Sequence, residues 1–172
     1  MNFLFIGLGS IGQRHLRNLN IISKKNKIYA YRRKFNTPSL NNKNQVIKTD
    51  IIKKYKVNLI SSLSNLNRFN INAAFICTPS SMHANEIIKI AKQKINIFVE
   101  KPICTNNEQI KKIEQVLKNT NVKTMVGYQL KFNPIINLLK NKISKNYKNI
   151  NFVQINHGES IKHFHPYENY KK

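Results

Sequence analysis

The chain has 172 residues, a hydrophobic content of 41% and a formal net charge of +23. This length is enough for one well-buried domain and little more. Its first residues show no leader peptide pattern, and no apolar run reaches the roughly 18–20 residues of a membrane helix, so we expect a cytoplasmic protein with no membrane partner.

The positive charge is spread along the chain. Lysine, asparagine and isoleucine together make up 77 of the 172 residues, which is typical of a protein encoded by an AT-rich genome. A nucleic-acid binder would gather basic and aromatic residues on one surface, so we expect no specific nucleic-acid partner and only weak, salt-sensitive attraction to polyanions. Cys77 and Cys104 fit neither a metal-binding nor a disulfide pattern and are expected to be free thiols.

Short apolar runs alternate with segments of helical periodicity along the chain. Strands are predicted at Asn2–Ile6, Lys27–Tyr31, Asn58–Leu63, Asn72–Cys77, Asn96–Val99, Lys123–Tyr128 and Asn151–His157. Helices or helical turns are predicted at Ser10–Ile22, Ile51–Tyr55, Ser64–Phe69, Ser81–Gln93, Asn106–Asn119 and Asn133–Ser144. Asp50 is expected to cap the second helix, and Thr37–Lys48 to form a loop with a weak helix. This alternation predicts an α/β fold with a Rossmann-like, doubly wound parallel sheet.

A glycine-rich turn, GLGSIG, follows the first predicted strand and opens the first predicted helix. Gly7 permits the tight turn, Gly9 lets a pyrophosphate approach the backbone, and Gly12 lets helix and strand pack closely. The N–H groups at the helix start, at Ser10 and Ile11, would face the anion. The turn therefore predicts a dinucleotide cofactor.

The residues after the second strand bear on the choice between NAD and NADP. A cofactor without a 2′-phosphate usually meets a carboxylate about twenty residues after the glycines. This chain has Arg32 and Arg33 there instead, and guanidinium groups pair with phosphate. The sequence leans slightly towards NADP.

Two further strand ends carry polar residues. The fifth predicted strand ends in Glu100-Lys101-Pro102, and Lys101 is expected in the crevice near the nicotinamide, where it would bind the substrate hydroxyl and help to move its proton. Glu100 would orient this lysine or cap a loop. The fourth strand ends in Thr78-Pro79, which would line the cofactor crevice, and His83 and Glu100 are expected to contribute to the same cofactor-binding region. His83, near the start of a helix, is expected there as a positioning or packing residue and not as an acid–base catalyst.

Four stretches together resemble the Gfo/Idh/MocA family, the glucose–fructose oxidoreductase and inositol dehydrogenase group. They are GLGSIGQRHLRNL (7–19), AAFICTPSSMHANEIIKIA (73–91), NIFVEKPICTN (96–106) and GYQLKFNP (127–134). The resemblance implies an N-terminal domain that binds NAD or NADP, a C-terminal α/β substrate domain, homo-oligomers, and hydride transfer to or from a sugar, cyclitol or related polyol. It maps the family's cofactor glycines onto Gly7, Gly9 and Gly12, its catalytic lysine onto Lys101, and its T-P-x-x-x-H segment onto Thr78, Pro79 and His83. Its aromatic residue near the substrate maps onto Tyr128.

One departure from the family concerns the catalytic histidine of its D-x-x-x-H motif. His163 and His165 lack the preceding aspartate, so the role is not carried over to them. Family members are considerably longer, and we expect this chain to be a truncated, N-terminal part, with a Rossmann domain at residues 1–147 and the start of the second domain at 148–172. The alternative to an oxidoreductase is a nucleotide-binding fragment without turnover.

Overall fold

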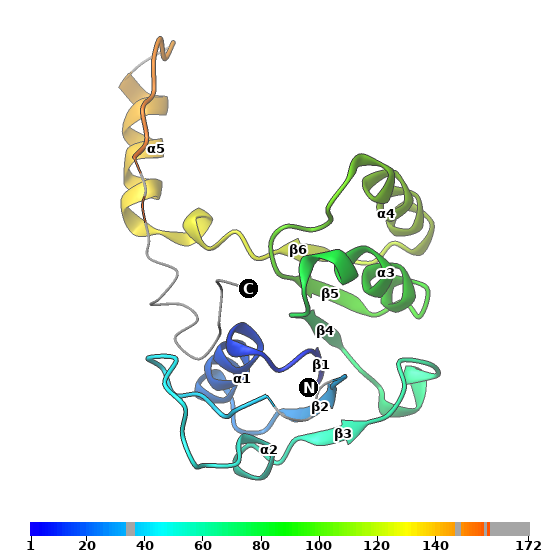
Figure 1. Cartoon of the computed structure of the whole chain (residues 1–172). Helices are drawn as coiled ribbons and strands as arrows, with labels where there is room; N and C mark the ends of the chain where they lie inside the picture. Colours follow the sequence, from blue (N-terminus) through cyan, green and yellow to red (C-terminus); the bar gives the residue numbers. More distant parts are fainter. Residues whose placement is uncertain (34–36, 147–148, 157, 159–172) are drawn as a thin grey trace, which may run out of the picture. The chain divides into compact units, whose positions relative to one another are not determined.

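A six-stranded parallel sheet forms the centre of residues 1–127 (Figure 1). The computed structural model describes residues 1–33, 37–146, 149–156 and 158. The strands are β1 (Asn2–Ile6), β2 (Lys27–Tyr31), β3 (Asn58–Ile60), β4 (Ala73–Ile76), β5 (Asn96–Val99) and β6 (Thr124–Val126). Their order across the sheet is β3-β2-β1-β4-β5-β6, and every neighbouring pair is parallel. The doubly wound Rossmann-like fold is confirmed.

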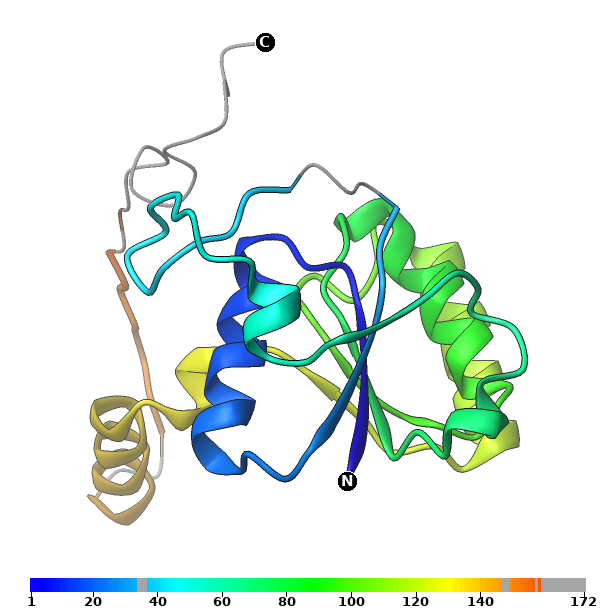
Figure 2. The ribbon, with the colours of Figure 1, turned by 90° about the horizontal axis from the view of Figure 1, so that it is seen from below.

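Helices cover both faces of this sheet (Figure 2). They are α1 (Ser10–Ile22), α2 (Ile51–Lys54), α3 (Ser80–Ala91) and α4 (Asn107–Thr120), with a 3₁₀ turn η1 (Leu66–Phe69). Successive side chains of a strand point to opposite faces. Leu4 and Ile6 therefore pack in a core cluster with Ile87 of α3, whereas Phe5 packs in a second cluster with Leu16 of α1.

The strand order reverses between β1 and β4. From β1 the chain winds outwards through β2 to β3, and it then returns to the other side of β1 and continues through β4 to β6. In such sheets the crevice at this switch point, beyond the carboxyl ends of the strands, is where ligands bind. The glycine turn after β1 and the polar turn after β4 both lie there.

Most predicted elements are found within one or two residues of their expected ends. The side chain of Asp50 caps α2 by accepting from the backbone N–H groups of Ile52 and Lys53. The third strand ends at Ile60, because β3 pairs only with the last three residues of β2. The loop at 37–48 contains an isolated antiparallel bridge between Leu40 and Val46 and no helix.

A second compact unit begins at Tyr128. It contains a 3₁₀ turn η2 (Gln129–Phe132) and helix α5 (Pro134–Asn146). The strand predicted at Asn151–His157 is wrong for the described residues 151–156, which form no strand. A strand needs a neighbour to satisfy its backbone N–H and C=O groups, and the described part of this unit offers no other strand. The predicted division at residues 147 and 148 stays a prediction.

In the described part of the chain, no helix is long and apolar enough to cross a bilayer.

Candidate functional site

The glycine turn after β1 packs directly against the turn after β4. Gly7 has a φ of +89°, a conformation that side chains rarely adopt, and a Cβ atom there would lie 2.9 Å from the carbonyl oxygen of Cys77. At Gly12 a Cβ atom would collide with the carbonyl oxygen of Gly7 and lie 3.3 Å from the Cβ of Cys77. Because Gly7 and Gly12 have no side chain, the turn, helix α1 and β4 can pack more closely than any larger residue would permit.

Gly9 differs from its two neighbouring glycines because it faces open space. A Cβ atom there would meet no atom within 4 Å. Gly9 is also the N-cap of α1, and no side chain caps this helix end. The backbone N–H groups of Ser10, Ile11 and Gly12 begin the helix, so its positive dipole end faces the open space. This geometry suits an anionic group such as a pyrophosphate.

The turn after β4 is held by two side chains of α3. His83 is 1% exposed, and its Nε2 lies 2.8 Å from the carbonyl oxygen of Thr78. The hydroxyl of Thr78 donates to Oε2 of Glu86, which is 4% exposed. Burial raises the pKa of Glu86, against the hydrogen bond from Thr78 and nearby positive charges. The other ring nitrogen, Nδ1, faces the carbonyl oxygen of Pro102, so the His83 ring contacts backbone carbonyl oxygens and not solvent. Thr78 and Pro79, by contrast, reach the surface.

The Glu100-Lys101-Pro102 turn lies beyond β5, next to the turn after β4. Its Lys101–Pro102 peptide bond is cis, and Lys101 is exposed. The Nε2 of His15, on α1, lies 2.7 Å from Oε1 of Glu100, in an ion pair whose side chains are only 20% and 13% exposed. Burial opposes ionisation of Glu100, but the hydrogen bond and charge of His15, with smaller contributions from Lys101, outweigh it and hold the pKa of Glu100 below its ordinary value. The expected role of Glu100 is thus refined: it ties the lysine turn to α1.

This ion pair makes the stability of the fold depend on pH. The pKa of Glu100 is lower in the folded protein than its ordinary value of 4.5, so the Glu100 carboxylate stabilises the fold above about that pH, and this contribution is lost as the pH falls through the folded pKa. We expect Glu100→Gln to lower the free energy of unfolding at pH 7 by about 1–2 kcal/mol and to flatten its fall between pH 5 and 3. Urea unfolding at several pH values measures both effects.

Glu108→Gln is the matched control for this measurement. Glu108 pairs with Lys112 on the exposed side of α4, with a side chain that is 76% exposed. This substitution should leave the free energy of unfolding nearly unchanged. A pH dependence in Glu100→Gln equal to that of the unmodified chain would contradict the role given to the ion pair.

The structure adds two site residues that the sequence analysis did not single out. His15 packs edge-on against Phe98, with ring centroids 4.9 Å apart, which fixes the ring that holds Glu100. Gln13 is 1% exposed; its side chain donates to the carbonyl oxygens of Leu8 and Pro38 and accepts from the backbone of Leu40, so it anchors the loop after β2 to α1. Both lie in a polar run of the helix, and their partners are far away in the sequence, as with His15 and Glu100, 85 residues apart.

Arg32 and Arg33 follow β2 at the same edge of the sheet. Arg32 is half-buried; burial lowers the pKa of its guanidinium and Asp50 opposes this change. Arg33 is exposed, and its Nη1 lies 3.4 Å from Sδ of Met82, at the start of α3. Both residues are therefore on the carboxyl-end side of the sheet, where the sequence predicts that they meet the 2′-phosphate of NADP.

The two cysteines contribute no chemistry at this edge. Both cysteines are free and buried, and burial raises the pKa of Cys77 far above the physiological range, so it is no nucleophile. Among the described residues, no group of three or more His, Cys, Asp or Glu side chains could hold a metal ion. Tyr128 is exposed and begins the second unit, so its role towards a substrate stays a prediction. His163 and His165 lie outside the described residues.

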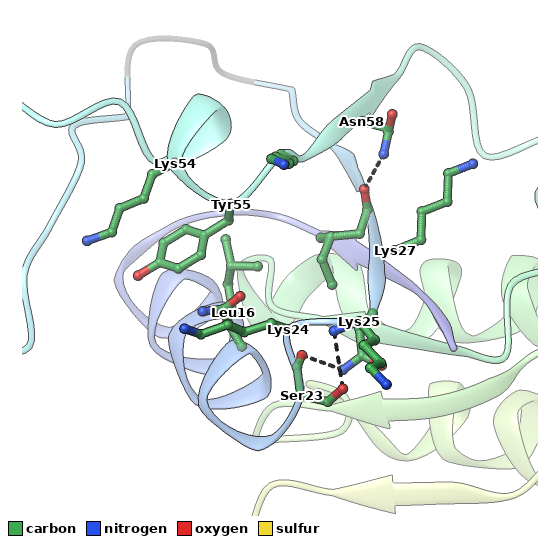
Figure 3. Close-up of a pocket in the computed structure, with 12 residues that line it drawn as sticks. Leu16, Ser23, Lys24, Lys25, Lys27, Lys54, Tyr55 and Asn58 are labelled. Carbon is green, nitrogen blue, oxygen red and sulfur yellow. Dashed lines mark hydrogen bonds between the residues drawn. The ribbon is translucent and has the colours of Figure 1, made fainter.

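A hollow of about 640 Å³ lies at the opposite end of the strands (Figure 3). It is lined by the end of α1, the Ser23–Ile28 segment, and residues of the connection from α2 into β3. None of the expected site residues lines it. A second hollow, of about 520 Å³, shares Lys27 and Asn58 with the first. Among the described residues, the expected site residues gather instead at the carboxyl ends of β1, β4 and β5, in a group that we call the strand-end site: Gly7–Gly12, His15, Thr78–His83 and Glu100–Pro102.

Known proteins resemble this chain in sequence and in fold. Scyllo-inositol 2-dehydrogenase (NAD(+)) of Bacillus subtilis (strain 168) is 31% identical over 129 residues, which are 75% of this chain and 36% of that protein. Inositol 2-dehydrogenase of Rhizobium meliloti (strain 1021) is 38% identical over 65 residues, 38% of this chain and 20% of that protein. The crystal structure of scyllo-inositol dehydrogenase from Lactobacillus casei with bound NAD(H) and scyllo-inositol has a TM-score of 0.67, with 22% identity over 84% of this chain and 41% of that one.

The chain spans less than half the length of the relatives it matches. The model of an oxidoreductase family with an NAD-binding Rossmann fold matches residues 1–128, which include the whole strand-end site. The chain therefore belongs to the Gfo/Idh/MocA oxidoreductase family, whose NAD-binding Rossmann domain it contains.

Proposed function

We propose that this chain binds NAD or NADP at the strand-end site and that it is an oxidoreductase, or the cofactor-binding half of one, acting on a sugar, cyclitol or related polyol. The observation that carries the proposal is the contrast among the three glycines. Gly7 and Gly12 are closed in by protein atoms, whereas Gly9 faces open space at an uncapped helix end. The residues present thus fit a bound pyrophosphate, with Gly7, Gly9, Ser10, Ile11 and Gly12 as its binding turn.

The other residues of the strand-end site have distinct roles in this proposal. Thr78 and Pro79 line the crevice beside the glycine turn. Lys101 is exposed on the adjacent turn, where its ammonium would hydrogen-bond the reacting hydroxyl of the substrate and help to move the hydroxyl proton. When bound, the nicotinamide ring supplies the hydride acceptor or donor. Tyr128 would contact the substrate.

The preference between the two cofactors rests on Arg32 and Arg33. No carboxylate follows β2, and a guanidinium there can pair with a 2′-phosphate, which favours NADP. The similar proteins point the other way, since one is named for NAD and another holds NAD(H). We propose a slight preference for NADP, measurable as the ratio of the two dissociation constants.

Lys101 provides the test of hydride transfer. With scyllo-inositol or myo-inositol as substrate, Lys101→Met should slow cofactor reduction about 10²–10⁴-fold, because it removes the group that handles the hydroxyl proton. It should leave the affinity for ADP-ribose, which lacks the nicotinamide ring, within twofold, because the glycine turn is untouched. Nicotinamide absorbance follows the reaction, and Lys118→Met, near the end of α4, is the matched control that should react at the unmodified rate.

A nucleotide-binding module without turnover is the second candidate, because the family match at residues 1–128 is to an NAD-binding Rossmann fold. Cofactor binding by the unmodified chain without reduction of either cofactor in the presence of any polyol would support this candidate. Reduction at the same rate by Lys101→Met and by the unmodified chain would contradict the role proposed for the lysine.

A further inference from the structure

We propose that His83 is a positioning residue: it fixes the Lys101–Pro102 turn against the Thr78 turn and so sets where the Lys101 ammonium stands relative to a bound cofactor. This inference rests on the proposed function for its consequence, but its structural basis is independent of any ligand. His83 lies in the first turn of α3 and is 1% exposed. It therefore reaches neither solvent nor a ligand directly.

Both ring nitrogens of His83 are used to join two loops. Nε2 lies 2.8 Å from the carbonyl oxygen of Thr78, five residues earlier. Nδ1 lies 2.7 Å from the carbonyl oxygen of Pro102, nineteen residues later. The two acceptors belong to the turns that follow the adjacent strands β4 and β5. One imidazole ring thus spans the gap between the two turns.

The chemistry of the ring suits this bridging position. Carbonyl oxygens only accept hydrogen bonds, so a neutral imidazole completes one of the two bonds at a time and the imidazolium completes both. The carboxyl group of Glu86, one turn further along α3, interacts electrostatically with His83 and also accepts from the hydroxyl of Thr78. Two buried side chains of α3 therefore hold the backbone and the side chain of Thr78.

The bridge continues from Thr78 to the glycine turn. The Cγ2 atom of Thr78 lies within 3.1 Å of where a Cβ on Gly7 would be, so the two turns are in close contact. The path from Gly7 through Thr78 and His83 to Pro102 joins the proposed phosphate-binding turn to the lysine turn. A rigid path of this kind keeps a reacting group in register with a cofactor that is bound elsewhere.

Two substitutions each remove one of the two hydrogen bonds of the His83 ring and keep the other. The amide nitrogen of glutamine reaches the position of Nε2, and that of asparagine the position of Nδ1, so His83→Gln keeps the bond to Thr78 and His83→Asn the bond to Pro102. We expect His83→Gln to speed amide hydrogen exchange across residues 100–105 at least tenfold and His83→Asn to speed it less. Ile90→Val, in the last turn of the same helix and fully buried, is the control for a general loss of packing and should leave this segment unchanged.

Ligand binding gives a second test, because a general loss of stability would weaken the binding of NADH and of ADP-ribose alike. ADP-ribose lacks the nicotinamide, so it needs the glycine turn but not the lysine turn. His83→Gln should weaken NADH binding at least fivefold and change ADP-ribose binding less than twofold. Equal weakening of both ligands would overturn the positioning role.

The outcomes keep this inference apart from the proposed function. If the unmodified chain binds neither NADH nor ADP-ribose, the proposed function fails, while the exchange measurement still decides whether His83 ties the two turns. Unchanged exchange across residues 100–105 in a folded His83→Gln variant would overturn the bridge. If neither variant folds, the ring N–H signals of His83 in the unmodified chain decide: slow exchange of the Nδ1 proton supports the bond to Pro102, and its absence contradicts it.

Discussion

Replacing Gly12 by alanine should destabilise the fold by about 3 kcal/mol or more. The added Cβ would collide with the carbonyl oxygen of Gly7, and it would also press on the Cβ of Cys77 at 3.3 Å. Neither neighbour can move easily, because one is backbone and the other belongs to the residue that follows the central strand β4. Urea unfolding followed by circular dichroism measures the loss.

Gly9→Ala is the matched control for this prediction. It adds the same methyl group to the same turn, where no atom lies within 4 Å. Alanine is a poorer N-cap than glycine, so a loss below about 1 kcal/mol is expected. A Gly12→Ala variant as stable as Gly9→Ala would show that the close approach of α1 to the glycine turn is not required.

Replacing Gly9 by tryptophan should abolish cofactor binding without unfolding the chain. The φ of −69° at Gly9 suits any residue, so the backbone can keep its conformation. The indole would occupy the open space above the start of α1, where the pyrophosphate is proposed to bind. We expect affinity for both NADH and NADPH to fall more than 100-fold, which corresponds to about 2.7 kcal/mol or more.

Ile22→Trp controls for the effect of the added indole. Ile22 ends the same helix at its far end and is 80% exposed. Its tryptophan variant should bind the cofactor as the unmodified chain does. Undiminished binding by a folded Gly9→Trp variant would place the cofactor elsewhere.

Features of the fold that depend on neighbouring residues could be predicted from the sequence. The order of apolar runs and helical segments was enough for the sheet, and a single side chain, that of Asp50, was enough for the start of α2. The glycine turn was recognisable because each glycine answers a local requirement: a positive φ at Gly7 and close approach at Gly12. Such local requirements produce a recognisable sequence pattern that does not depend on the rest of the chain.

Contacts between distant parts of the chain produce no such local pattern and could not be predicted from the sequence. His15 stands among polar residues of α1, and nothing nearby indicates its ion pair with Glu100. His83 and Glu86 are buried on the inner side of α3, and no neighbouring residue indicates that their partners are Pro102 and Thr78. The failed strand after residue 150 has the same origin, since a strand pattern does not tell whether a partner is present.

A titration of the purified chain with NADH and NADPH tests most directly whether the strand-end site binds a dinucleotide. Nicotinamide fluorescence should change saturably, with dissociation constants in the micromolar range typical of cofactors and substrates. The Gly9→Trp variant should show no saturation, and the ratio of the two constants gives the preference expected from Arg32 and Arg33. A folded chain that binds neither cofactor would contradict the account.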